Sequence, residues 1–154
     1  MAAGPALVSG ATPALGRAWL ALCCALALHI TDEALTGFLS VWNPTATELR
    51  ARLPWLPVPI FRFEVWLGGL IAAVALAFAI SPIFFRGGGK LRLPAYLVAA
   101  FVGIGNGLGH ITGTILGHTF ADIRFARPAP GFYSSPLLIA AAVWVMAELR
   151  RSHE

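Results

Sequence analysis

The chain has 154 residues, of which 58% are hydrophobic and 12% are charged, and its formal net charge is +4. The charged share is about half of the roughly 25% found in ordinary soluble domains, and the mean hydropathy is +0.76. This composition excludes a soluble monomer, a disordered chain, a collagen-like repeat and a disulfide scaffold. We therefore expect an integral membrane protein, and no nucleic-acid binding, because the basic residues are scattered singly among apolar runs.

Four apolar stretches meet or approach the length of about 20 residues that a helix needs to cross a bilayer. They lie at residues 18–42, 59–85, 93–120 and 132–149. The connections are too short for a second domain, so the expected fold class is all-α, a four-transmembrane-helix bundle. The bundle occupies residues 17–150 as one domain, with a flexible N-terminal tail at 1–16 and a C-terminal tail at 151–154.

The connections between the spans contain sequence motifs that predict local structure and orientation. Residues Thr45-Ala-Thr-Glu48 match a capping box, which predicts a short surface helix that ends before Pro54. Arg86-Gly-Gly-Gly-Lys90 predicts a tight turn between the second and third spans. Lys and Arg are in slight excess on the side of the two termini, so the positive-inside rule places both termini in the cytoplasm.

The first span carries three ionisable residues where the bilayer disfavours them. His29, Asp32 and Glu33 are spaced i, i+3 and i+4, which places them on one face of a helix. Ionisable groups at this depth are functional-site candidates by default, because each costs several kcal/mol unless it faces protein, water or a metal. Two carboxylates beside an imidazole can bind a divalent cation or share a proton.

The third span carries two parallel rows with a spacing of four residues. The polar row is Asn106, His110, Thr114 and His118. The second row consists of glycines, which let a neighbouring backbone approach closely in lipid, and it is Gly105, Gly109, Gly113 and Gly117. We expect this approach to bring the first span to His110, and the same glycine face offers a surface for a homo-oligomer.

The depths of the polar residues agree with one another. Spans one and three run in the same direction, and His29, Glu33 and His110 lie at similar levels near or just beyond their midpoints. The Asp, Glu, Arg and His side chains within the first three spans lie near the midplane or between it and the face that carries the first and third connections. This distribution predicts a water-accessible pocket that opens on one face of the membrane.

These residues also resemble a known family. His29-Ile-Thr-Asp32-Glu33, then Asn106-xxx-His110, then Pro130-Gly131-xx-Ser134-Ser135-Pro136 are similar to the HXXEE family of small bacterial membrane proteins, which has no established activity. The resemblance covers most of the chain, although Asp32 stands where the family has Glu. It implies a location in the bacterial inner membrane and a site at the matching residues, but no reaction.

The leading hypothesis is a metal-dependent hydrolase that acts on a lipophilic or interfacial substrate. His29, His110 and Glu33 would hold a divalent metal ion, with zinc favoured. Asp32 and Glu33 are the candidate catalytic carboxylates, one of which takes a proton from water. Asn106 would donate to a developing oxyanion or orient His110.

Four further residues are secondary candidates near the same membrane face. They are Glu64, His118, Arg124 and Arg127. Solvation near the interface is sufficient to explain Glu64 and His118. The two arginines would either hold an anionic substrate or contact headgroups of the membrane lipid.

Two other classes of protein remain open. In the first, the same acids bind a proton or cation and couple it to a small solute, which four helices would achieve only as an oligomer. In the second, the polar residues only specify helix pairing in a structural membrane scaffold. The sequence lacks the His-Glu-x-x-His motif of zinc proteases and the Gly-x-Ser-x-Gly nucleophile elbow.

Overall fold

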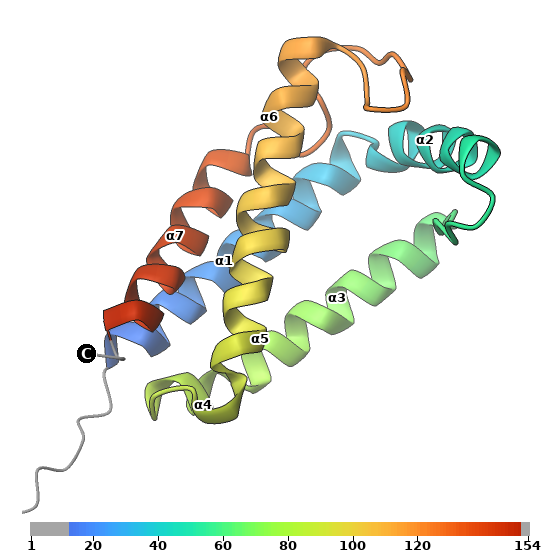
Figure 1. Ribbon diagram of the computed structural model, residues 1–154. Helices are drawn as coiled ribbons and strands as arrows, with labels where there is room; N and C mark the ends of the chain where they lie inside the picture. The colour runs from blue at the N-terminus through green and yellow to red at the C-terminus, as the bar shows by residue number, and fades with distance from the viewer. Residues whose placement is uncertain (1–12, 152–154) are drawn as a thin grey trace, which may run out of the picture.

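The computed structural model describes residues 13–151, which fold into helices joined by turns and loops (Figure 1). The helices are α1 (Pro13–Leu35), α2 (Phe38–Arg52), α3 (Phe63–Ala79), α4 (Ser81–Phe85), η1 (Gly89–Leu91), α5 (Arg92–Leu97), η2 (Val98–Gly105), α6 (Asn106–Leu116) and α7 (Ser135–Arg151). Within the described range the only extended pairing is an isolated bridge between His118 and Arg124. The all-α class is therefore confirmed. The predicted tails fall mostly on residues 1–12 and 152–154, outside the described residues.

Three helical segments are long and apolar enough to cross a membrane. They are Pro13–Leu35, Phe63–Phe85 and Gly89–Leu116, which correspond to the first three predicted spans. Helices suit this role because they satisfy their backbone hydrogen bonds internally, where lipid offers no partners. The fourth predicted span corresponds to α7, whose 17 residues are fewer than the usual number of about 20. The fourth crossing therefore stays a prediction.

The first predicted span extends to residue 42, but α1 ends at Leu35. Gly37 has a φ of 77°, a left-handed conformation that glycine adopts without steric penalty and that commonly ends a helix. Helix α2 begins directly after it and runs in another direction across that end of the molecule (Figure 1). The apolar residues 38–42 therefore belong to a second helix.

The capping box predicted at Thr45 is wrong. Thr45 lies inside α2, and its hydroxyl donates to the backbone oxygen of Val41 over 2.7 Å. The helix has already begun at Phe38, because the turn at Gly37 starts it without a side-chain cap. It ends at Arg52, before Pro54, as expected.

The third span is a rod built from η1, α5, η2 and α6 (Figure 1). Its middle section, η2, is a π-helix with i→i+5 hydrogen bonds, a wider turn that occurs frequently at functional sites. Asn106 follows directly after this wide section. The rod ends at Leu116 because Gly117 has a φ of 77°. His118 and Phe120, which the predicted span included, therefore lie in the connection to α7.

The hydrophobic core lies where α1 meets α7 and α4. Leu22, Leu138 and Val145 are fully buried between α1 and α7. Trp19 stacks on Phe84 with ring centroids 4.1 Å apart, which fixes α4 against the beginning of α1. In lipid, such packing contributes through dispersion and shape, because the membrane itself supplies no hydrophobic driving force.

The closest helix packing uses glycines outside the predicted row. A Cβ atom on Gly103 would lie 2.3 Å from Cβ of Ala142, and one on Gly107 would lie 2.7 Å from Cγ1 of Ile139. Both neighbours belong to α7. A Cβ atom on Gly109, in the predicted row, would meet nothing within 4 Å. The rod therefore approaches α7 through Gly103 and Gly107.

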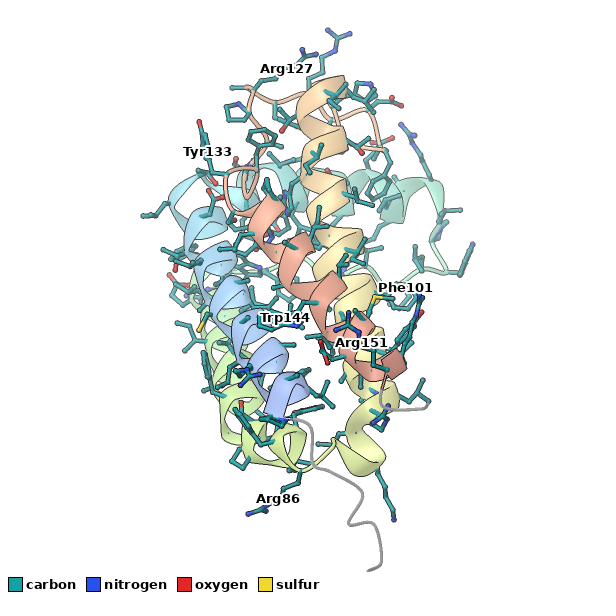
Figure 2. All side chains as sticks on the ribbon, turned by 90° about the vertical axis from the view of Figure 1, so that its left-hand side faces the viewer. Arg86, Phe101, Arg127, Tyr133, Trp144 and Arg151 are labelled. Carbon is teal, nitrogen blue, oxygen red and sulfur yellow. The ribbon has the colours of Figure 1, made fainter. Side chains whose placement is uncertain are left out.

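The two ends of the bundle carry different elements. Figure 2 shows Arg127 and Tyr133 at the end formed by α2 and residues 117–134, and Arg86 at the opposite end. The described chain begins and finishes on the side of the bundle that carries α4 (Figure 1). Because α1 and α6 both run toward the end that carries Arg127, their last turns lie near the loop 117–134.

Candidate functional site

Helices α1 and α6 bring three ionisable side chains together in the interior. His29 and Glu33 lie one turn apart on α1 and are 1% and 4% exposed, and His110 on α6 is 8% exposed. Nε2 of His110 lies 3.0 Å from Oε1 of Glu33, and Nε2 of His29 lies 3.5 Å from the same oxygen. The predicted approach of the first and third spans at these residues is therefore present, and we call this group the His–Glu–His cluster.

Gly131 closes the cluster from the loop before α7. A Cβ atom at this position would lie 3.0 Å from Cγ of Glu33 and 3.0 Å from Cε1 of both histidines. Its φ is 81°, so glycine satisfies both the backbone conformation and the lack of space. Thr36 holds the loop in place, since its hydroxyl accepts a hydrogen bond from the Gly131 N–H over 3.2 Å.

Ser134 connects His29 with Asp32. Its hydroxyl lies 2.8 Å from Nδ1 of His29 and 2.8 Å from Oδ2 of Asp32, and its backbone N–H donates to the same carboxylate oxygen over 2.9 Å. An ionised carboxylate can only accept, so the hydroxyl proton points to Asp32 and Nδ1 of His29 carries the proton that Ser134 accepts. Asp32 therefore lies behind His29, outside the cluster, and sets the tautomer of the imidazole.

This tautomer leaves the lone pair of His29 on Nε2, facing the cluster. The side-chain nitrogen of Asn106 lies 2.9 Å from this atom, and it donates because Nε2 carries no proton. The sequence suggested that Asn106 orients His110 or stabilises an oxyanion. The structure places it on His29, at the point where the wide η2 section passes into α6.

The donor set fits a metal ion. Nε2 of His110 is buried and lacks a hydrogen-bond partner among the described residues, so its 3.0 Å approach to Glu33 does not have hydrogen-bond geometry. Ligands at the usual zinc distances of about 2.0–2.1 Å from a tetrahedral ion lie about 3.3 Å apart, close to both measured separations. Ligand atoms of all three residues lie within 4.8 Å of one another, so the cluster could hold a metal ion.

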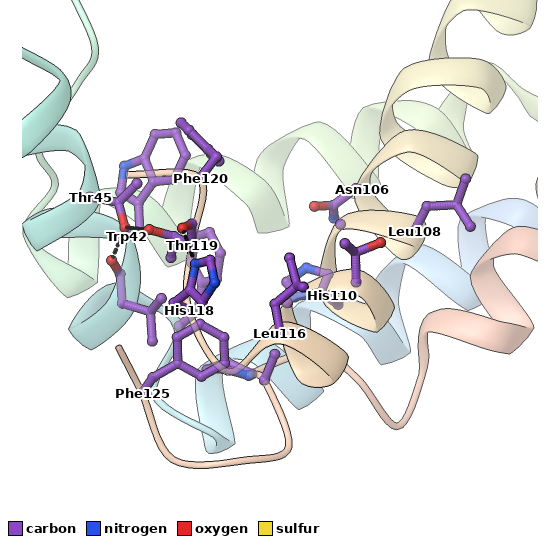
Figure 3. A pocket seen from close by; sticks show the side chains of 17 residues that line it. Trp42, Thr45, Asn106, Leu108, His110, Leu116, His118, Thr119, Phe120 and Phe125 are labelled. Atoms are coloured by element: carbon purple, nitrogen blue, oxygen red, sulfur yellow. Dashed lines mark hydrogen bonds between the residues drawn. The ribbon is translucent and has the colours of Figure 1, made fainter. Parts of the chain in front are cut away.

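Two apolar cavities meet the cluster from different sides. The first has a volume of about 440 Å³ and lies between α2, α6 and the loop 117–134, with Asn106 and His110 in its wall (Figure 3). The second has a volume of about 380 Å³ and lies between α1, α3 and α5, with His29, Glu33 and again Asn106 in its wall. The cluster is thus buried from bulk solvent but borders two open apolar spaces.

The four secondary candidates lie outside the cluster. Glu64 is exposed by 75% and forms an ion pair of 3.8 Å with Arg62. Arg127 donates to the backbone oxygen of Leu116 at the end of α6, and Arg124 is exposed. His118 shares the wall of the first cavity with His110, although Nδ1 of His118 binds the backbone oxygen of Thr119.

In the sequence, Gly131 and Ser134 stood out only as part of the family resemblance, and they were not predicted to be site residues. Neither residue is ionisable, so neither stands out at bilayer depth as His29 or Glu33 does. The available signal was the run Pro130-Gly131-xx-Ser134, a turn sequence directly before an apolar helix. This run is expected at the same end of the bundle as the polar residues of the first span. It therefore predicts a loop that can cover those polar residues.

Comparison of the chain with protein-family models, with curated proteins and with solved structures finds no match. The resemblance to the HXXEE family stays a prediction.

Proposed function

We propose that the protein is a metal-dependent hydrolase embedded in the membrane, which acts on a lipophilic or interfacial substrate. One observation carries this proposal: the buried His29–Glu33–His110 group could hold a metal ion, and it borders apolar cavities instead of the aqueous phase. A scaffold needs helix-pairing contacts but has no use for a closely spaced donor set beside open apolar space.

Zinc suits the donor set best. Two histidines and one glutamate form one of the ligand sets of catalytic zinc sites, and they leave a fourth position for water or substrate. Such an ion lowers the pKa of bound water and polarises a carbonyl group. The second-layer contact of His29 with Ser134 is of the kind that orients imidazole ligands and raises their basicity.

The side chains divide the remaining work. Glu33 is the carboxylate that faces the two imidazoles, so we assign to it both a ligand role and the acceptance of a proton from water. Asp32 acts through Ser134 as a positioning residue that keeps Nδ1 of His29 protonated. Asn106 would turn its amide from Nε2 of His29 to the oxygen that gains negative charge during hydrolysis.

We propose the bacterial inner membrane as the location, with four crossings and both termini in the cytoplasm. The resemblance to the HXXEE family and the small excess of Lys and Arg on the side of the termini support this arrangement. Both ends of the described chain lie toward the Arg86 end of the bundle, as four crossings would require.

Metal analysis of the protein purified in detergent tests the function. We expect about one zinc ion per chain, lost in His29→Ala and in His110→Ala but kept in His118→Ala. His118 is the matched control, because it lies in the wall of the same cavity as His110 and outside the cluster. Zinc that both cluster variants retain would refute the assignment. A protein free of metal would favour the proton-coupled carrier or the scaffold.

A further inference from the structure

The two apolar cavities share a single polar boundary. Asn106 contributes to the walls of both, His110 contributes to the first, and His29 and Glu33 contribute to the second. Asn106 and the His–Glu–His cluster therefore lie between the two cavities. Each volume, about 440 and 380 Å³, falls in the range of roughly 300–1,000 Å³ typical of small-molecule sites.

The walls of both cavities favour an uncharged occupant. Aromatic and aliphatic side chains such as Phe38, Trp42 and Phe125 form the first wall, and Leu70 and Val74 contribute to the second. Neither wall contains Arg, Lys or Asp, and the carboxylate of Glu33 is already turned to the two imidazoles. A charged group placed beside these side chains would lose its hydration without gaining a partner.

Both cavities have exposed apolar rims on candidate membrane spans. Leu108 and Leu116 of α6 form part of the first rim, and Leu76 of α3 and Val102 of η2 form part of the second. These residues belong to segments able to cross a membrane, so their exposed side chains face hydrocarbon. An apolar molecule can therefore enter either cavity sideways from the bilayer.

We propose that the substrate is a neutral acyl compound, an ester or an amide, that carries an apolar group on each side of its carbonyl. One apolar group occupies each cavity, and the carbonyl lies at Asn106, next to the cluster. This inference rests on the proposed hydrolase function, and it adds the substrate class and the route of entry.

The hydrolysis balances without a further reactant. The oxygen of water bonds to the carbonyl carbon, the bond from that carbon to the leaving oxygen or nitrogen breaks, and a water proton passes through Glu33 to the leaving group. The products are a carboxylic acid in one cavity and an alcohol or amine in the other. Ionisation of the acid makes it a poor occupant of an apolar wall, which favours its release.

Photo-crosslinking to uncharged long-chain esters tests the inference. One probe carries a diazirine in its acyl chain and a second carries it in its alkyl chain. We expect the two probes together to label both cavities. Labelled residues of the first cavity should lie within 112–125, and labelled residues of the second cavity should lie within 70–77. An unlabelled neutral ester or amide should compete, whereas an alkyl sulfate of equal length should not. Equal competition by the sulfate would overturn the proposal.

Two pairs of variants locate the labelling. Gly109 lies in the wall of the first cavity with open space at its Cβ position, and Gly105 lies one turn away outside that wall. Gly109→Phe should abolish labelling of the first cavity, whereas Gly105→Phe should preserve it. Ala73→Phe and Ala72→Phe form the same pair for the second cavity. The inference would be overturned if the variants that fill a cavity and their controls changed the labelling by the same amount.

The outcome stays distinct from that of the metal test, because crosslinking requires neither metal nor turnover. Selective labelling of a metal-free protein would refute the hydrolase and support the ligand class. Zinc bound at the cluster together with labelling confined to the outer faces of the helices would support the metal site and refute this substrate.

Discussion

Ser134 donates two hydrogen bonds to Asp32, one from its backbone N–H over 2.9 Å and one from its hydroxyl over 2.8 Å. The first residue of this pair lies in the loop before α7 and the second lies near the end of α1. The bonds therefore join two elements that are far apart in sequence. They also set the donor direction of the hydroxyl that contacts His29.

Replacement of Ser134 tests this connection. Ser134→Ala removes the acceptor of the Nδ1 proton of His29, so the imidazole loses its fixed orientation. Loss of such a contact behind a metal ligand typically lowers metal affinity by about 10–100-fold, and we expect a zinc titration to show a drop of this size. Ser134→Thr retains the hydroxyl and should retain most of the affinity. Equal zinc affinity of the alanine variant and the natural protein would contradict the assignment.

The two neighbouring carboxylates should respond differently to amide substitution. Glu33→Gln removes the negative charge from the centre of the cluster, so we expect zinc binding to be lost. Asp32→Asn leaves an oxygen that can still accept both hydrogen bonds from Ser134, so the loss of affinity should be smaller. Circular dichroism should show that both variants keep their helices. Equal losses of zinc would indicate that both carboxylates are direct ligands.

Substitution of Gly131 should abolish zinc binding in addition to the loss of stability that backbone strain causes. Gly131→Ala forces an L residue into a left-handed conformation, at roughly 1–2 kcal/mol, and places Cβ against all three cluster residues. We expect a lower unfolding temperature and loss of zinc binding. Gly87→Ala is the matched control, since its φ is 94° and its Cβ atom would meet nothing within 4 Å. Gly87→Ala should lower the unfolding temperature but keep zinc binding. Loss of zinc in this control would contradict the view that crowding of the cluster by Cβ causes the loss in Gly131→Ala.

Cysteine accessibility tests the number of crossings. In a background with Cys23→Ala and Cys24→Ala, an impermeant maleimide should label Ala126→Cys from outside intact cells. Lys90→Cys and Arg150→Cys should react only after the cells are opened, because both lie toward the other end of the bundle. Labelling of positions 126 and 150 from the same side would show that α7 does not cross. Zinc content of the cysteine-free background serves as the control for folding.

The cluster residues were predictable because the bilayer makes ionisable groups conspicuous. His29, Glu33 and His110 stand out in otherwise apolar spans, and the depth comparison placed them at similar levels. The separate position of Asp32 was harder to predict. Residues at i+3 and i+4 differ by about 100° around the helix axis, and only the position of the α7 loop decides that Glu33 faces α6 and Asp32 faces Ser134.

The glycine rows and the helix break depended on tertiary structure. Two rows of glycine spaced by four residues exist in the third span, and the one that meets α7 contains Gly103 and Gly107. No local signal distinguishes it from the row with Gly105 and Gly109. The apolar pattern likewise continues through Gly37, because α2 follows α1 after a turn of two residues, Thr36 and Gly37.

The π-helical section ahead of Asn106 makes the function dependent on segment length as well as on composition. Each residue of a helix advances the chain by about 100° around the axis. The wide section already holds about one residue more per turn than an α-helix. If residues 89–97 kept their contacts, insertion of one further residue into η2 would therefore swing Asn106 and His110 away from α1 by about that angle. The lengthened rod would remain apolar and able to cross a bilayer, yet its imidazole would no longer face Glu33.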